Sequence, residues 1–235
     1  MPPDTTAPDP TPDRGEDTRR RLVEAALPEF ARDGYDGVSI RRIAEAAEAN
    51  VAAVAYHFGG KRGLYLAVAR HVAERNGAAV APMVERVAAE VAAADGDRVR
   101  LGALLARVTT GFLRGMVTAR EDGRAGFLVR ELLTPSDAFD ILYDGFFEPM
   151  NRAMSLIAAA AHGVPPDSAA AVLRGHLVFG AVMPFIAGRA VVERRLGREI
   201  LEGAALEETL GVAVAAACGS LGLPVPASPG VPPHA

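Results

Sequence analysis

The sequence predicts an all-α protein in which a small N-terminal helix-turn-helix domain precedes a larger helical domain. Apolar residues recur at three- and four-residue spacing along most of the chain, as they do on one face of a helix. No segment shows the period of two that is typical of strands. With 235 residues and 50% hydrophobic content, the chain can bury both cores. We expect a disordered tail over 1–17, the helix-turn-helix domain over 18–65, the larger domain over 66–223 and a second disordered tail over 224–235.

The first expected helix spans residues 18–32. Leu22, Ala26 and Phe30 repeat every four residues and form its apolar stripe. Asp33-Gly34 then supplies a stop signal, because glycine readily adopts the left-handed conformation that ends many helices.

A short second helix is expected after Ser39, a residue type that favours the N-cap position. Its apolar residues are spaced as on one helical face, and they are Ile40, Ile43, Ala44 and Ala47. The residues that follow leave room only for a tight turn. The next helix must therefore cross this one steeply and pack with it on the first helix, which is the helix-turn-helix arrangement.

Asn50 is the expected N-cap of the third helix. Residues at helical spacing give this helix an inner face, formed by Val51, Val54 and Phe58. Its outer face is expected to present Ala52, Ala53, Tyr56 and His57. Small side chains on an outer face allow a helix to approach the base edges of a DNA major groove closely.

Charge is distributed unevenly along the chain. The net charge is −4, yet residues 14–70 hold ten basic and eight acidic side chains, whereas residues 71–235 hold fifteen and eighteen. The helix-turn-helix segment is thus the positive part of an acidic protein, which favours local attraction to a nucleic-acid backbone.

These residues resemble the TetR family of bacterial transcriptional repressors over about fifty positions. The matching residues are Phe30, Gly34-Tyr35, Ser39-Ile40-Arg41, Ile43-Ala44, Asn50-Val51, Tyr56-His57-Phe58, Lys61 and Leu64-Tyr65. The resemblance implies a repressor that binds a palindromic double-stranded DNA operator as a homodimer and responds to a small-molecule effector. It also implies that the larger domain binds the effector and forms the dimer.

Ten residues are candidates for DNA contact: Ser39, Arg41, Arg42, Asn50, Val51, Ala52, Ala53, Tyr56, His57 and Lys61. Tyr56, His57 and Lys61 are expected along the phosphate backbone, and Lys61 is the only lysine in the chain. Two alternatives stay open. Tyr56 and His57 can instead cap a small core, and the paired arginines can form an ordinary solvated helix face.

Glu48 departs from the family pattern, since the family usually has glycine in this turn. A non-glycine residue in a left-handed turn costs roughly 1 kcal/mol, and Glu48 also places a negative charge near DNA. The alternative function is therefore a helical small-molecule-binding module that has lost specific operator binding.

The larger domain is expected to be a succession of helices. The first begins at Lys61 and continues through the seventies, and the others span about 98–120, 124–133, 135–162, 168–194 and 204–221. The segment from Arg130 to Asp140 is similar to a CecR-like branch of TetR regulators.

Large flexible and aromatic side chains gather in the middle of the chain and suit an apolar ligand pocket that can repack. The candidate ligand-binding residues are Phe112, Met116, Phe127, Arg130, Phe146, Met150 and His176. The alternatives are an ordinary core for the apolar residues and internal ion pairs or surface positions for Arg130 and His176.

The helices around 168–194 and 204–221 are the dimer candidates. Their stripes contain Leu173, Leu177, Gly180, Ala181 and Pro184 on one helix and Leu206, Leu210, Ala213, Val214, Ala217 and Leu221 on the other. The family resemblance implies a four-helix bundle across a two-fold axis. The alternative is an ordinary monomeric core.

Composition argues against several other classes of protein. The five histidines stand far apart without metal-ligand spacing and the single cysteine, Cys218, has no evident partner, so we expect no enzyme activity, no cofactor and no metal. The apolar run 177–187 is too short to span a membrane. The first seventeen residues lack the apolar core of a signal peptide, which favours a cytoplasmic protein.

Overall fold

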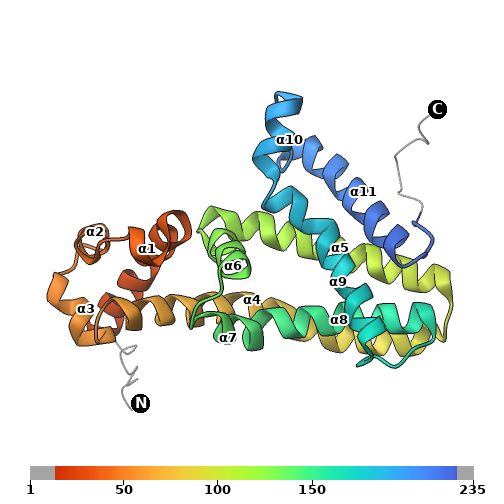
Figure 1. Ribbon diagram of the computed structural model, residues 1–235, viewed down its shortest axis with the longest axis horizontal. Coiled ribbons are helices and arrows are strands. Elements are labelled where there is room, and N and C mark those ends of the chain that lie inside the picture. The colour runs from red at the N-terminus through yellow and green to blue at the C-terminus, as the bar shows by residue number, and fades with distance from the viewer. Residues whose placement is uncertain (1–13, 227–235) are drawn as a thin grey trace, which may run out of the picture.

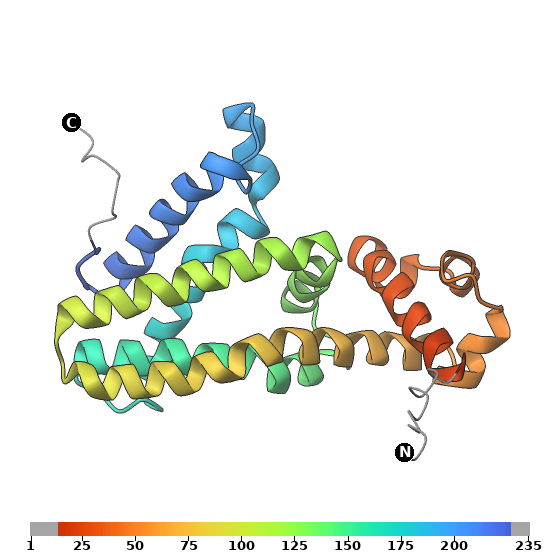
Figure 2. The same ribbon diagram turned by 180° about the vertical axis from the view of Figure 1, so that it is seen from behind.

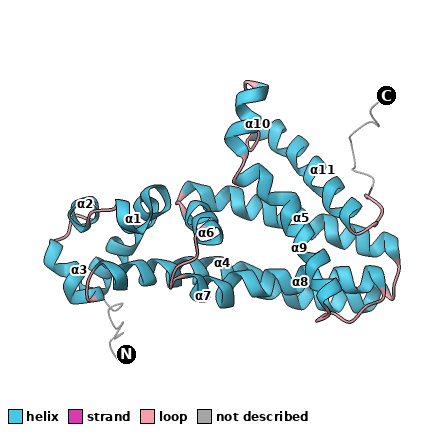
Figure 3. Ribbon diagram, viewed as in Figure 1, coloured by secondary structure: helices cyan, strands magenta, loops and turns pink. Residues whose placement is uncertain are grey.

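The computed structural model describes residues 14–226, and this part of the chain is built from helices without a strand (Figure 3). The predicted all-α fold is confirmed for it. The helices are α1 (Arg14–Gly37), α2 (Ile40–Ala46), α3 (Val51–Phe58), α4 (Lys61–Ala94), α5 (Arg98–Glu121), α6 (Arg124–Leu133), α7 (Phe139–Leu142), the π-helical turn η1 (Tyr143–Phe147), α8 (Glu148–His162), α9 (Ala169–Ile186), α10 (Arg189–Leu196) and α11 (Gly203–Ser220).

Helices α1 to α3 form a small domain at one end of an elongated molecule (Figure 1). The long helix α4 begins in this domain and runs the length of the larger one, and α5 returns beside it (Figure 2). Helix α8 packs on both of these helices, α9 packs on α8 and α5, and α11 contacts α5 and α9. Helix α4 therefore belongs to both domains.

The expected helix-turn-helix core is formed as the periodicity indicates. Leu22, Phe30, Ile43, Val54 and Leu64 are all buried. They join one continuous apolar cluster that extends along α4 into the larger domain. The two domains consequently share a core rather than being joined by a free linker.

Helix α1 differs from the expected 18–32 at both ends. It begins at Arg14, so residues 14–17 of the predicted tail are helical, whereas residues 1–13 and 227–235 lie outside the described part. Gly34 has the predicted non-helical conformation, with φ of 72°, and a further short turn extends the helix to Gly37.

Two other helix boundaries were predicted wrongly. The helix expected from residue 135 begins at Phe139, because the Ser136 backbone and hydroxyl bond to the Glu131 carboxylate and form a turn instead. The helix expected over 168–194 ends at Ile186, and α10 begins after Gly188, a residue with low helix propensity.

The segment α7–η1–α8 lies against α4 through two glycines. A Cβ atom on Gly77 would lie 2.5 Å from the Gly145 carbonyl oxygen, and one on Gly145 would lie 2.8 Å from the Ala73 Cβ. Only glycine permits this approach of backbones. It fixes the position of η1 and hence of Phe146, which follows Gly145 directly.

A buried carboxylate joins the two domains. Glu131 on α6 accepts a 2.5 Å hydrogen bond from the Tyr65 hydroxyl of α4, and Ser136 donates to it from its backbone amide and hydroxyl at 3.0 and 2.9 Å. Tyr65 in turn packs edge-on against Phe30 of α1, with ring centroids 4.8 Å apart. Burial, and next the bond to Glu131, raise the pKa of Tyr65.

Tyr65→Phe is expected to lower the free energy of unfolding by about 1–3 kcal/mol at neutral pH, the contribution of a hydrogen bond to a charged group. Because the folded protein holds the Tyr65 proton more tightly than the unfolded chain, where tyrosine titrates near pH ~10, this contribution is complete below pH ~10 and decreases above it. Denaturant unfolding from pH 7 to 11 measures the gap between wild type and variant. Tyr35→Phe, at a more exposed tyrosine, is the control. A gap that persists unchanged at pH 11 contradicts the assignment.

Candidate nucleic-acid interface and ligand cavity

The turn between α2 and α3 is left-handed at Glu48, where φ is 49°. The Glu48 and Ala49 amides donate to the carbonyls of Glu45 and Ala44, which close the turn, and Ala47 is buried beneath it. The side chain of Glu48 is exposed. The strained conformation expected from the sequence is therefore present.

Helix α3 begins as predicted, because the Asn50 side chain accepts a 2.8 Å hydrogen bond from the Ala52 amide. Its carboxamide oxygen is thus occupied, and the NH₂ group remains for a base edge or a phosphate. Helix α2 differs, since Ser39 has the extended N-cap conformation but its hydroxyl makes no capping bond. Ser39 is exposed.

The outward face of α3 is rotated relative to the prediction. Val51, expected on the inner face, is exposed, whereas Ala53, expected outside, packs against the core. The inner face is formed by Ala53, Val54 and Phe58. Exposed side chains on the other face are Val51, Ala52, Ala55 and Tyr56, and Ala55 is the member that the sequence analysis missed.

Tyr56 is 85% exposed, which rules out the alternative that it caps a core. His57 is only half-buried, and its ring lies edge-on against Tyr56 with centroids 4.9 Å apart. Lys61 begins α4, where its Nζ lies 3.4 Å from the Asp36 carbonyl oxygen and 4.7 Å from the Tyr35 ring centroid. These three side chains lie at or just beyond the end of α3.

The paired arginines of α2 have different surroundings. Arg42 forms ion pairs with Glu29 at 2.6 Å and Asp33 at 3.3 Å, both on α1. Arg41 is exposed and has no ion pair within the described residues. Arg42 therefore joins α2 to α1, whereas Arg41 is the better candidate for a phosphate contact.

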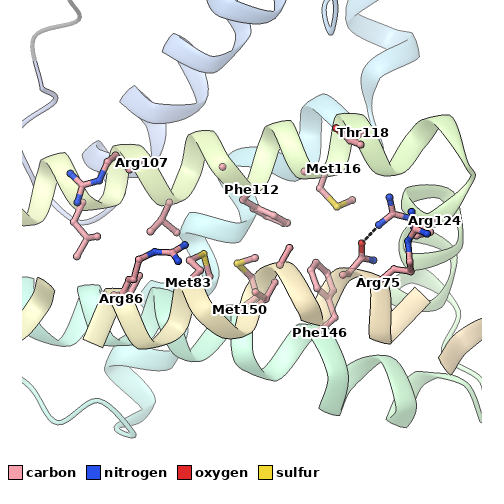
Figure 4. Close-up of a pocket in the computed structure, with 18 of the residues that line it drawn as sticks. Arg75, Met83, Arg86, Arg107, Phe112, Met116, Thr118, Arg124, Phe146 and Met150 are labelled. Atoms are coloured by element: carbon pink, nitrogen blue, oxygen red, sulfur yellow. Dashed lines mark hydrogen bonds between the residues drawn. The ribbon is translucent and has the colours of Figure 1, made fainter. Parts of the chain in front are cut away.

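A cavity of about 560 Å³ lies between α4 and α5 (Figure 4). Four of the candidate ligand residues, Phe112, Met116, Phe146 and Met150, line it. Several polar and flexible side chains that were not among the candidates also line it, namely Arg75, Asn76, Met83, Arg86, Glu90, Arg107, Thr118 and Arg124. Its size is within the roughly 300–1,000 Å³ typical of small-molecule sites.

Three candidate ligand residues lie outside this cavity. Phe127 is core, with its ring centroid 5.0 Å from that of Tyr65. Arg130 points to α1 instead. His176 is exposed on α9, where it stacks on Phe179 and lies 3.3 Å from the Asn151 carboxamide oxygen. The structure does not bring these three residues to this cavity, because position in sequence alone does not define which way each helix faces.

Arg124 is the buried charge at one end of the cavity. Its Nε donates to Asp122 at 2.7 Å and its Nη1 donates to the Asn76 carboxamide oxygen at 2.5 Å. Arg75 lies at the same end (Figure 4). Burial, and next the charge of Arg75, lower the pKa of the neighbouring His71.

Helix α6 connects this cavity with the helix-turn-helix domain. Arg124 is its first residue, and near its other end Arg130 donates to the carbonyls of Ala31 at 3.4 Å and Arg32 at 2.8 Å in α1. A side chain on Gly34 would collide with the Arg130 guanidinium, since its Cβ would lie 2.7 Å from Nη1. Helix α6 therefore contacts the cavity at one end and α1 near the other.

Only part of the predicted dimer surface on α9 and α11 is exposed. On α11, Leu210, Ala213 and Ala217 are buried against α5 and α9, together with Leu221 just beyond the helix end, so this part of the predicted stripe is protomer core. On α9 the predicted stripe residues Leu173, Leu177, Gly180 and Pro184 are exposed, together with Val172. On α11 the exposed apolar residues lie beside the predicted stripe and include Gly211, Val212, Ala215, Ala216 and Gly219. Leu173 and Leu177 are 69% and 56% exposed.

Helix α9 (Ala169–Ile186) is the one helix among residues 14–226 that is long and apolar enough to cross a membrane. It packs against α8 and α11, and Val178, Phe179 and Val182 are buried. Apolar residues on one side of this helix therefore belong to the core of the protein.

Comparison with known proteins agrees with both parts of the fold. Residues 22–68 match the family model of bacterial regulatory proteins of the tetR family, and residues 98–218 match that of the C-terminal domain of the HTH-type transcriptional dual regulator CecR. The chain belongs to the TetR family. Proteins of this family are ligand-responsive, DNA-binding transcriptional regulators rather than enzymes.

Individual TetR-family proteins show how far the similarity extends. CecR of Shigella flexneri is 27% identical over 184 residues, which cover 78% of this chain and 82% of CecR. The repressor AcnR of Corynebacterium glutamicum is 40% identical over 63 residues, or 27% of this chain and 34% of AcnR. The crystal structure of HlyIIR, a hemolysin II transcriptional regulator, superposes with a TM-score of 0.56 at 19% identity, covering 86% of this chain and 97% of HlyIIR.

Arg41→Ala and Arg42→Ala are expected to affect different properties, DNA binding in the first case and folding stability in the second. Loss of Arg41 removes one phosphate contact per subunit, so affinity falls about equally for all duplex sequences and the slope of log K against log salt decreases by about one for each bound subunit. Loss of Arg42 removes the ion pairs to α1 and lowers stability by about 0.5–1 kcal/mol without changing that slope. Salt titrations by fluorescence anisotropy and denaturant unfolding measure both quantities. An unchanged slope for Arg41→Ala removes Arg41 from the interface.

Glu48→Gly and Glu48→Ala separate charge from backbone strain. Glycine relieves the left-handed strain and alanine does not, so Glu48→Gly should be more stable than Glu48→Ala by about 1 kcal/mol. Both variants remove the negative charge and should bind duplex DNA equally, and more tightly than wild type at low salt. Equal stability of the two variants would show that the turn is not strained.

Proposed function

We propose that this chain is a repressor that binds a palindromic operator as a homodimer and is released by a small molecule with a large apolar part. The observation that carries the proposal is the direct connection between the cavity and the helix-turn-helix domain. Helix α6 lines the cavity at Arg124 and holds α1 through Arg130. Helix α4 makes the same connection from Lys61 to the cavity residue Asn76 and beyond.

The outward face of α3 can enter a major groove and offers few hydrogen-bonding groups to the base edges. Val51, Ala52 and Ala55 are small or apolar and allow close approach and contact with thymine methyl groups. The free NH₂ group of Asn50 supplies one directional contact. Arg41, Lys61 and the hydroxyl of Tyr56 are left for phosphates, which position the helix without selecting sequence.

Two copies of the chain are required for specificity, because one short helix contacts too few base pairs. The exposed apolar side chains of α9 and α11 supply a self-complementary surface for a two-fold dimer. Such a dimer places its two α3 helices on half-sites about one helical turn apart. We place this homodimer on double-stranded DNA in the cytoplasm, with no role as an enzyme.

Release follows from a population shift between two spacings of the α3 helices. A ligand that fits the cavity better in the non-binding spacing moves the equilibrium by its difference in affinity for the two states. Helix α6 transmits the change, because its polar contacts with α1 through Arg130 and with α4 through Glu131 join it to both DNA-binding elements.

Selection from a random pool of duplex DNA at moderate salt tests this function. Protein refolded from denaturant, and so free of carried-over ligand, should enrich a palindrome whose half-sites are about one turn apart. Arg41→Ala is the matched control and should recover the same palindrome with lower yield. If the refolded protein enriches no sequence, the alternative function holds, namely a small-molecule-binding module without an operator.

A further inference from the structure

The cavity is a positively charged site in an acidic protein. Its lining contains four arginines, Arg75, Arg86, Arg107 and Arg124, against one carboxylate, Glu90. The whole chain has a net charge of −4. A purely apolar ligand would leave this charge unused, so the lining indicates that the effector carries a negative charge.

The two ends of the cavity are not equivalent. Figure 4 shows Arg75 and Arg124 at one end and Arg86 and Arg107 at the other. Arg107 is already paired with Glu90, whereas Arg86 is exposed and has no ion pair among the described residues. At the first end, Arg124 is buried, and Asp122 engages only its Nε. Arg75, like Arg86, is exposed and has no ion pair within residues 14–226, so the two ends differ in the buried Arg124 and not in their exposed arginines.

Asn76 supplies a second and independent indication at the Arg124 end. This side chain lines the cavity, is only 9% exposed, and its Nδ2 has no hydrogen-bond partner. The orientation of the amide is fixed, because Arg124 donates to its oxygen and a flipped amide would place donor against donor. The unpartnered atom is therefore a donor. A buried donor without an acceptor is costly, and a ligand oxygen would satisfy it.

The rest of the cavity suits a flexible hydrocarbon. Phe112, Phe146 and the thioethers of Met83, Met116 and Met150 line it between the charged ends (Figure 4). Gly111 and Gly115 of α5 also line it, and a Cβ on either would meet nothing within 4 Å. Methionine side chains repack easily around chains of differing length.

We propose that the effector is an amphipathic carboxylate whose head group binds Arg124, Asn76 and Arg75, while its hydrocarbon lies along the methionines. The proposal rests on the proposed function and specifies the ligand of the same cavity. The head group contacts the first residue of α6, which is the helix that holds α1. Charge recognition is thereby placed at the start of the connection to the DNA-binding domain.

Three probes with the same ten-carbon chain test the proposal by isothermal titration calorimetry: decanoate, decan-1-ol and decylammonium. The refolded full-length protein should bind decanoate at least about tenfold more tightly than decan-1-ol, as expected for charge-assisted hydrogen bonds in a partly dry site. Decylammonium should bind most weakly, since its charge is repelled by the arginines.

Asn76→Asp is the decisive variant. It keeps an acceptor for Arg124 and so preserves the fold, but it replaces the free donor by a carboxylate that repels the head group. Decanoate affinity should fall at least about tenfold while that for decan-1-ol changes less than about twofold. Arg75→Gln should also weaken decanoate selectively, and Arg86→Gln, at the other end, is the matched control with less than about a twofold effect on either probe.

Equal affinity for acid and alcohol, or a decanoate affinity unchanged in both Asn76→Asp and Arg75→Gln, overturns the anionic head-group site and leaves the proposed function intact. If none of the probes binds, the inference fails together with the ligand half of the proposed function. The DNA half is tested separately by the selection from random duplexes, which needs no ligand.

Discussion

The buried carboxylate of Glu131 determines how the two domains of this protein are joined. Its charge lies in the protein interior, where it is stable only because the Tyr65 hydroxyl and two groups of Ser136 donate hydrogen bonds to it. These donors come from α4 and from the turn after α6. The carboxylate thus fixes α6 against α4, and with α6 fixed, Arg130 reaches the carbonyls of α1. Removing one donor would leave the buried carboxylate with fewer hydrogen bonds and so lower the stability of this junction.

Polar contacts at both ends make α6 better suited than α4 to carry a signal. Helix α4 is held along its length mainly by buried apolar side chains, and its Tyr65 and Asn76 side chains form hydrogen bonds with α6. Helix α6 is held at one end by Arg124 and at the other by Arg130 and Glu131, through hydrogen bonds that are either formed or broken. Helix α4 also spans both domains, but length alone does not confer coupling.

The sequence predicted where the helices begin and end better than it predicted which face of each helix is buried. Spacing and capping residues gave α2, α3, α5 and α6 nearly to the residue, since these signals are local. The start of α7 was missed because it depends on Ser136 bonding to Glu131, a contact that competes with helix formation. Val51 was predicted on the inner face of α3 and Ala53 on the outer face, and the structure shows the reverse. The rotation of so short a helix about its axis is set by its packing, which periodicity does not determine. The cavity arginines were missed for a related reason, since an arginine on a helix is usually solvated.

The cavity owes its charge to the antiparallel arrangement of α4 and α5, which brings Arg86 opposite Arg107 and Arg75 near the residues that follow α5 (Figure 4). Glu90 neutralises only one end of it. The chain keeps a negative net charge while concentrating positive charge at two places, the α2–α4 surface and the cavity. Phosphates are available to the first and a carboxylate would satisfy the second. An anionic effector is then repelled by the acidic remainder of the surface but not by the cavity, so the same charge pattern that directs the protein to DNA also directs the effector to its site.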